Sequence, residues 1–211
     1  GFMAIAILIF SFTALMAGVF LAIRGGGLSH RVAGLSLALF LLAGLFQTGL
    51  SLAVFGQLPH AALGSPGSPF PWVLAGFLIA AAVAEEAARA VTNLRLIARP
   101  DVRARLSIAL VWWLVETMLA VMGPAITFLD NFASHAADHG LQAALERADQ
   151  ETARIASGIT NIVTMRLPSL AMHLIAAWLI APGPHWRLRL AGAVTLHAAF
   201  NIIMLIVLRA G

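Results

Sequence analysis

The chain has 211 residues, of which 61% are hydrophobic and only 10% are charged, and its mean hydropathy is +0.93. This composition indicates an integral membrane protein that contacts the lipid bilayer, and it argues against a soluble domain. The absence of cysteine excludes disulfides and thiolate metal sites, and the net charge of +4 comes without the basic and aromatic face that a nucleic-acid partner requires.

Six apolar stretches are long enough to cross a bilayer, since a transmembrane helix needs about 20 residues. No pattern of strands competes with them, and a backbone in lipid must satisfy its own hydrogen bonds, as a helix does. We therefore predict an all-α, polytopic membrane helix bundle of about six transmembrane helices, with a single domain over residues 1–211. In chain order, the predicted spans cover approximately residues 2–23, 32–56, 72–97, 106–128, 155–181 and 188–209.

Arginine is concentrated in the loops after the first, third and fifth predicted spans. Eight of the 13 basic residues lie there: Arg24, Arg31, Arg95, Arg99, Arg103, Arg105, Arg187 and Arg189. The alternate loops hold only His60 and a mostly acidic stretch within residues 129–154. Because arginine-rich loops stay in the cytoplasm, we expect both chain termini on the outer side (N-out and C-out).

The two outer loops differ in character. Residues 57–71 are rich in proline, glycine and serine, so we expect no regular structure there. Residues 129–154 hold apolar side chains at helical spacing among charges, which predicts a short amphipathic helix. The simplest interpretation is a solvated connecting helix, and a lid or an extension of the fifth span are the alternatives. The apolar positions are Leu141, Ala144, Leu145 and Ala148.

Three charged residues, Glu85, Glu86 and Arg89, interrupt the predicted span over residues 72–97. Placing one ionised side chain at the centre of a membrane helix costs about 2.5–3.5 kcal/mol even on lenient scales. Arg89 follows the two glutamates by four and three residues, so its guanidinium can pair with either along one helix face. One carboxylate is then held as a counter-ion, and the other is available as a base.

Further polar residues interrupt the last three predicted spans: Glu116, Arg166, His173, His197 and Asn201. With a rise of about 1.5 Å per residue, the acids and histidines of these spans, Glu85 included, lie roughly 12 to 18 Å from the cytoplasmic ends. Taken singly, each has a structural explanation as an interhelical hydrogen bond or as a Glu116–Arg166 ion pair. Their common depth instead predicts one shared site, to which the first two spans contribute only hydrophobic surface.

Spacing within the last two predicted spans supports a shared site. His197 and Asn201 are four residues apart and therefore share one helix face. Arg166 and His173 are seven residues apart and also share one helix face. Pro168 lies between them and removes a backbone hydrogen bond, so we expect it to loosen the helix locally.

The order of these motifs resembles the CAAX protease and bacteriocin-processing superfamily of intramembrane peptidases. The Glu-Glu-x-x-Arg spacing is similar to that of the PrsW and YhfC branches. A Glu on the next helix and an Arg seven residues before the first His are YhfC-like features. The resemblance covers the four helices over residues 72–209. The matching residues, in order, are Glu85, Glu86, Arg89, Glu116, Arg166, His173, His197 and Asn201.

The resemblance implies an intramembrane endopeptidase in a bacterial or archaeal cytoplasmic membrane. Such an enzyme would hydrolyse a peptide bond of a membrane-embedded or membrane-associated substrate. A water activated by glutamate would attack that bond, with Glu85 or Glu86 as the general base and Arg89 beside it. By the same resemblance, Glu116 and Arg166 would support the site.

The roles of the histidines depend on whether a metal takes part, which the resemblance leaves open. Without a metal, His173 would hold the attacking water, and His197 with Asn201 would stabilise the oxyanion. With one, His173, His197 and Glu85 would form a three-ligand site for Zn²⁺ or another divalent metal, with an open fourth position. The His-Glu-x-x-His signature of zinc peptidases is absent.

Two alternative functions use the same residues. A proton-coupled membrane transporter could relay protons through buried acids and histidines, although no inverted repeat or pair of broken helices is evident. A catalytically inactive peptidase homologue could bind membrane partners through the same cavity. Two departures from the family pattern keep this second alternative open: Met165, where the branch often has Glu, and Trp112-Trp113, where it often has a Gly/His-rich approach.

Overall fold

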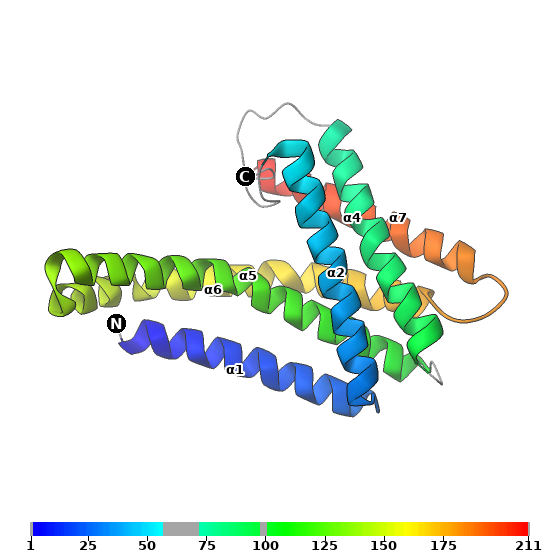
Figure 1. Ribbon diagram of the computed structural model, residues 1–211, viewed down its shortest axis with the longest axis horizontal. Helices are drawn as coiled ribbons and strands as arrows, with labels where there is room; N and C mark the ends of the chain where they lie inside the picture. Colours follow the sequence, from blue (N-terminus) through cyan, green and yellow to red (C-terminus); the bar gives the residue numbers. More distant parts are fainter. Residues whose placement is uncertain (1, 57–71, 98–100, 211) are drawn as a thin grey trace. The chain divides into compact units, whose positions relative to one another are not determined.

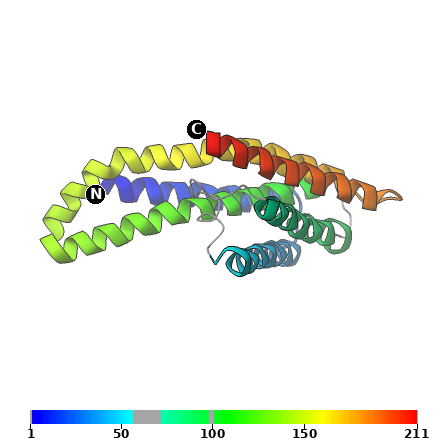
Figure 2. The same ribbon diagram turned by 90° about the horizontal axis from the view of Figure 1, so that it is seen from above.

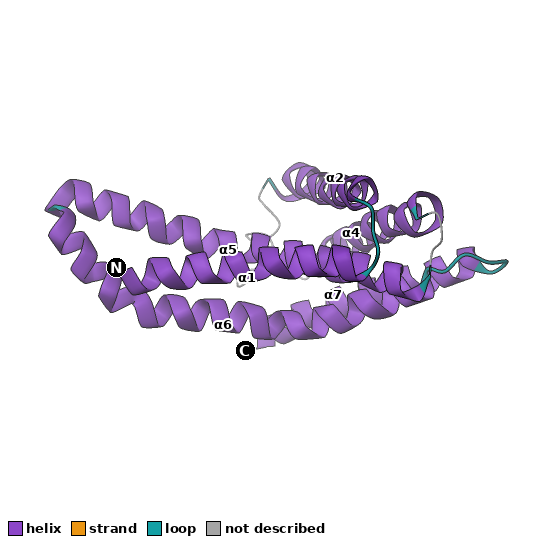
Figure 3. Cartoon of the chain, turned by 90° about the horizontal axis from the view of Figure 1, so that it is seen from below, coloured by secondary structure: helices purple, strands orange, loops and turns teal. Residues whose placement is uncertain are grey.

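A computed structural model describes residues 2–56, 72–97 and 101–210, which are almost entirely helical (Figures 1 and 3). The predicted loop over residues 57–71 lies outside the described residues. No strand occurs in the described part of the chain, so the all-α prediction is confirmed there. The helices are α1 (Phe2–Gly25), α2 (His30–Phe55), α4 (Trp72–Val91), α5 (Val102–His139), α6 (Leu141–Leu179) and α7 (Trp186–Ala210), and a π-helical turn, η1 (Thr92–Leu96), continues α4.

Five of the described helices are long and apolar enough to cross a membrane, as an integral membrane protein requires. Helix α4 is not among them, although it has 20 residues. Its three charges, Glu85, Glu86 and Arg89, fall within every stretch of α4 that is long enough to span, and such side chains need partners other than lipid. The five apolar stretches are Ile5–Gly25, His30–Phe55, Val102–His139, Ala156–Leu179 and Trp186–Val207.

The chain divides into two compact units. The hairpin unit comprises Gly1–Ala22 and Leu110–Leu170, and the glutamate unit comprises Ile23–Ala109 and Ala171–Gly211. Each unit has its own buried apolar core. Each therefore has its own packing that positions side chains within it.

In the hairpin unit, the chain reverses direction between α5 and α6 at Gly140 (Figure 2). The φ angle of Gly140 is 88°, in the left-handed region that glycine adopts without a steric penalty. One buried apolar cluster joins α1 to the two helices of this hairpin, and it includes Leu8, Val121, Phe128 and Ile159. This cluster holds the three helices of the unit together.

The amphipathic segment predicted within residues 129–154 is partly contained in helix α6. Residues 141–151 are helical, but they are the first part of α6 rather than a separate short helix. The segment is therefore an extension of the fifth predicted span, with Ala144 and Ala148 buried and Leu141 exposed. The helix also continues through Pro168 without a break, although a proline leaves one helix carbonyl without its usual donor.

In the glutamate unit, α4 packs against both α2 and α7 (Figures 1 and 2). The first half of α4 belongs to a cluster of large apolar side chains: Leu74, Phe77, Leu78 and Leu205. The end of α4 belongs to a cluster that is rich in alanine: Ala90, Met172, Ala176, Ile180 and Ala193. Small side chains let helix backbones approach closely, so α6 and α7 come near the charged half of α4.

The C-terminal end of α6 is tied to the start of α5 and to η1. Nη1 of Arg105 donates to the carbonyls of Ala177, Trp178 and Ile180, at 3.3, 2.9 and 3.4 Å. The side-chain amide of Asn93 donates to the Ile180 carbonyl at 3.3 Å. Because the last carbonyls of a helix have no partner within it, these two side chains supply the donors that the end of α6 needs.

Candidate active site

The charged residues of α4 lie together inside the glutamate unit. Glu86 and Arg89 are fully buried, and Glu85 is 9% exposed. A helix turns by about 100° per residue, so the adjacent glutamates point in different directions. Glu86 and Arg89 are three residues apart and share a face. Each carboxylate therefore meets a different set of partners.

Arg89 connects α4 to α6. Its Nη1 lies 3.4 Å from Oε1 of Glu86 and donates to the backbone carbonyl of His173 at 3.1 Å. Its Nη2 lies 2.6 Å from Nδ1 of the His173 ring. A guanidinium only donates hydrogen bonds, so Nδ1 must accept, and the neutral ring then carries its proton on Nε2. Arg89 thus sets which nitrogen of His173 is a donor.

His197, on α7, lies near both glutamates. Its Nδ1 is 2.7 Å from Oε1 of Glu86, and its Nε2 is 3.7 Å from Oε2 of Glu85. An ionised carboxylate only accepts hydrogen bonds, so Nδ1 of His197 carries a proton and donates it to Glu86. The centroids of the His173 and His197 rings are 5.8 Å apart. The two histidines and the two carboxylates therefore form one cluster.

Glu85 has a different partner from a different helix. Nε2 of Gln47, on α2, donates to Oε1 of Glu85 at 2.6 Å. Oε2 of Glu85 and Oε2 of Glu86 are both buried and have no hydrogen-bond partner among the described residues. Leaving a buried acceptor without a donor is costly, so a further hydrogen-bond donor would bind favourably at either oxygen.

The structure brings together five of the six residues that the sequence suggests for catalysis: Glu85, Glu86, Arg89, His173 and His197. The sixth, Asn201, follows His197 by one turn of α7 and is half-buried. Its side-chain amide makes no hydrogen bond to the part of the chain that the structure describes. Its role at an oxyanion stays a prediction.

Glu116 and Arg166 lie in the hairpin unit and form the ion pair that was one of the two explanations of these residues from the sequence. Nη1 of Arg166 is 2.7 Å from Oε1 of Glu116, and both side chains are half-buried. Nε1 of Trp113 donates to the Arg166 carbonyl at 2.7 Å, and the neighbouring Trp112 is fully buried. The pair itself is confirmed, whereas its support of the glutamates stays a prediction.

Gln47 corrects the expectation that the first two predicted spans contribute only hydrophobic surface. The signal was present, because Gln47 is the longest polar side chain of the span over residues 32–56, whose other polar residues are Ser36, Thr48 and Ser51. An amide at that depth needs a partner inside the protein. Residue spacing could not identify Glu85 as the partner of Gln47. The hydrogen bond joins α2 to α4, and the sequence does not give the relative rotation of these two helices.

The side chains of the cluster do not fit the three-ligand metal site that is one of the two mechanisms left open by the resemblance. Among the described residues, no group of three or more Asp, Glu or His side chains is arranged to hold a metal ion. Ligation through Nε2 of His173 would move its proton to Nδ1, where it would face the guanidinium of Arg89 at 2.6 Å. His197 does not present the same obstacle, because its Nδ1 is directed at Glu86 and its Nε2 would be the ligating atom. Metal binding by His173, His197 and Glu85 stays a prediction that this geometry does not favour.

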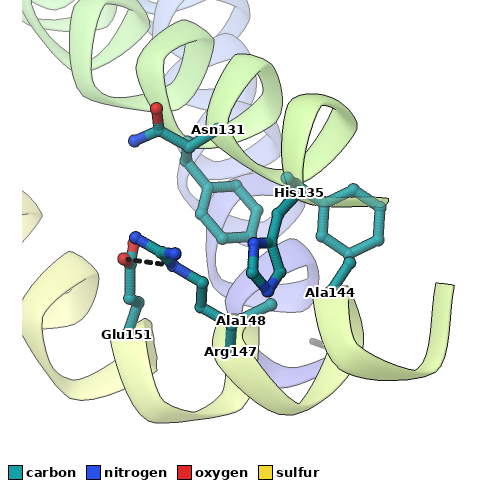
Figure 4. Close-up of a pocket in the computed structure, with 8 residues that line it drawn as sticks. Asn131, His135, Ala144, Arg147, Ala148 and Glu151 are labelled. Atoms are coloured by element: carbon teal, nitrogen blue, oxygen red, sulfur yellow. Dashed lines mark ion pairs between the residues drawn. The ribbon is translucent and has the colours of Figure 1, made fainter. Parts of the chain in front are cut away.

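A separate pocket lies in the hairpin unit, beside the turn between α5 and α6 (Figure 4). Its polar lining includes His135, Arg147 and Glu151. Nε of Arg147 is 3.6 Å from Oε1 of Glu151, and the Arg147 side chain is 55% exposed. An exposed ion pair of this kind contributes little and already matches its own charges, so we assign no chemistry to this pocket.

Comparison with known proteins found no match: neither a protein-family model, nor a curated protein, nor a solved structure matches the chain.

Proposed function

We propose that this chain is an intramembrane endopeptidase in which Glu85 activates a water for attack on a peptide bond of a membrane-embedded or membrane-associated substrate. The contrast between the two adjacent glutamates carries the proposal. Glu86 is held by Arg89 and His197, which suits a counter-ion. Glu85 accepts from a neutral amide and is 9% exposed, whereas Glu86 is fully buried, so Glu85 suits a general base that a water can reach.

The charges of this cluster balance if His197 is protonated on both ring nitrogens. Two carboxylates are then matched by one guanidinium and one imidazolium, and the cluster is neutral overall. Neutrality and mutual hydrogen bonds lower the cost of burying these charges in a membrane protein. In that state His197 donates through Nδ1 to Glu86 and presents a second N–H beside Glu85.

In the proposed reaction, Glu85 takes a proton from a water, and the water oxygen attacks the carbonyl carbon of the peptide bond. His173 donates from Nε2 to the same water and keeps it beside the base. Negative charge develops on the carbonyl oxygen and is stabilised by the Nε2–H of His197 and by the amide of Asn201. Glu85 then gives its proton to the leaving amine as the C–N bond breaks.

The same proposal includes a six-span topology in which α4 crosses the membrane and both chain termini lie outside. Partners from α2, α6 and α7 reach the charges of α4, and a charged helix is tolerated in a bilayer when protein groups meet its charges. The arginine-rich loops would lie in the cytoplasm. Glu116 and Arg166 would support the structure as an ion pair of the hairpin unit.

Cleavage of single-span helical peptides by the purified chain in lipid vesicles tests the function, with products identified by mass spectrometry. We expect Glu85→Gln to lower the cleavage rate at least about 100-fold, because a general base contributes about 10²–10⁴-fold. Glu146→Gln makes the same chemical change at an exposed position of α6 and should keep the wild-type rate. EDTA should also leave the rate unchanged, because the proposed reaction uses no metal.

Each alternative function has its own outcome in this experiment. A Glu85→Gln variant that cleaves at the wild-type rate would contradict the assignment of the base. Inhibition by EDTA that Zn²⁺ reverses would favour the metal-dependent mechanism. Proton-coupled solute uptake without any cleavage, lost in Glu85→Gln, would favour the transporter. Peptide binding without either activity would favour the inactive homologue.

A further inference from the structure

We infer that Gln47 of α2 is a positioning residue for the base: it holds one oxygen of Glu85 so that the other faces His197 and the attacking water. The inference rests on the proposed function. Gln47 belongs to none of the motifs that the sequence suggests for catalysis, and its role follows from the contact between α2 and α4.

The bond between Gln47 and Glu85 is short and joins two helices. Nε2 of Gln47 lies 2.6 Å from Oε1 of Glu85, and the two residues are 38 positions apart in the chain. Hydrogen bonds to an ionised acceptor are shorter and about twice as strong as neutral ones. Glu85 is only 9% exposed, so water competes little for this oxygen. The contact is therefore strong enough to set the orientation of the carboxylate.

Without this bond, Glu85 would have a competing partner on its own helix. Arg89 follows it by four residues, the spacing at which glutamate and arginine side chains pair along a helix. A Glu85 that turned toward Arg89 would become a second counter-ion, and its oxygens would face a guanidinium instead of a water. Gln47 holds Glu85 on the side of α2 and so keeps the two adjacent carboxylates in different roles.

A neutral amide suits this task better than a charged donor. Lysine or arginine at position 47 would add a positive charge to a cluster whose charges balance when His197 is protonated on both ring nitrogens. The amide of Gln47 supplies an N–H donor without adding a charge.

Infrared difference spectroscopy of the full chain in lipid vesicles tests the contact without any substrate. The carboxylate band of Glu85 is the band that Glu85→Gln removes. Gln47→Leu should shift this band, because the carboxylate loses its N–H donor. Thr48→Val is the matched control on the next residue and should leave the band in place, because the Thr48 hydroxyl donates to the Gly44 carbonyl of its own helix at 3.0 Å.

Peptide cleavage by the same variants tests the positioning role. Gln47→Leu should lower kcat roughly 10- to 100-fold, the effect of removing one hydrogen bond to a charged group, and should change KM little. KM is spared because Gln47 contacts the base and not the substrate. Thr48→Val should keep both constants. Leucine is apolar and favours insertion, and Gln47→Met is the second variant if Gln47→Leu does not fold.

The possible results separate this inference from the proposed function. A shifted band with lowered kcat and unchanged KM supports the inference. An unchanged Glu85 band in Gln47→Leu overturns it, whatever the cleavage rate. A shifted band with unchanged kcat overturns the positioning role and leaves the peptidase in place. If the band shifts but the wild-type chain cleaves no peptide, the proposed function fails and the contact between Gln47 and Glu85 stands.

Discussion

Glu85 and Glu86 are adjacent on one helix, and their side chains therefore point toward different surroundings. Consecutive residues lie about 100° apart around a helix axis, so the two side chains point in different directions. Both lie near His197, but Glu86 also pairs with Arg89, whereas Glu85 accepts from Gln47. Spacing along the chain leaves the two glutamates equivalent, since Arg89 is within reach of both. The partners from other helices remove that equivalence.

Glu86→Ala should destabilise the protein more than Glu85→Ala. Glu86→Ala takes the carboxylate away from the buried Arg89 and His197, and breaking a buried ion pair costs roughly 3–5 kcal/mol. Glu85→Ala removes the acceptor of the half-buried Gln47 amide, which costs about 1–3 kcal/mol. Circular dichroism in detergent measures the thermal midpoints. A lower midpoint for Glu85→Ala would contradict the role of Glu86 as the counter-ion.

Helix α6 carries His173, and side chains from other elements hold the end of this helix. Arg105 donates to three carbonyls there, the first of which, that of Ala177, lies one turn after His173. The position of the histidine ring therefore depends on a contact with the start of α5. In the sequence, Arg105 is one of the arginines of a loop that we expect in the cytoplasm. The composition of that loop does not predict that the Arg105 side chain caps a helix.

Arg105→Met should lower the thermal midpoint, whereas Arg103→Met should not. Both changes remove one positive charge from the same segment, so their effect on topology is matched. Arg105 is 5% exposed and donates to backbone carbonyls, whereas Arg103 is exposed. Leaving a buried carbonyl without its donor costs about 1–3 kcal/mol. Equal midpoints for the two variants, again by circular dichroism, would count against the capping role.

Five of the described helices have an apolar stretch long enough to span a membrane, whereas α4 has charges within every stretch of that length, and the two kinds of helix need different surroundings. Helix α2 exposes large apolar side chains, as contact with lipid requires: Leu41, Leu42, Leu45 and Phe46. Helix α4 instead buries its charges among protein groups. Such a helix is stable in a bilayer only with its protein partners in place, so α4 depends on its neighbours more than the five apolar helices do.

If α4 crosses the membrane, the loops at its two ends lie on opposite sides. The chain has no cysteine, so single cysteines can be introduced without removing any. Ala61→Cys and Asp138→Cys should react with a membrane-impermeant thiol reagent added to intact cells. Gly26→Cys and Pro100→Cys should react only after the membrane is opened. Equal reactivity at positions 61 and 100 would mean that α4 does not span.

The bounds of the last helix agree closely with the span predicted from the sequence. The last predicted span, 188–209, corresponds to Trp186–Ala210. The agreement fails for the fifth span, predicted over 155–181, because α6 already begins at Leu141. Charged residues end a membrane-spanning segment but do not end a helix, since glutamate, glutamine and arginine all favour helical backbone. Hydropathy therefore predicts the apolar part of a helix better than the residue at which the helix itself begins.

The sequence alone predicts the helical architecture, the embedding in a membrane and the group of polar residues that need partners. It can do so because composition and helical spacing are local properties of the chain. Helix packing adds what spacing cannot give: the contact of Glu86 with His197, the direction of the His173 ring toward Arg89, and the contact of Gln47 with Glu85. Each is a hydrogen bond or ion pair that forms only within about 3 to 4 Å. The rotation and register of α2, α4, α6 and α7 set those distances, and no local pattern encodes them.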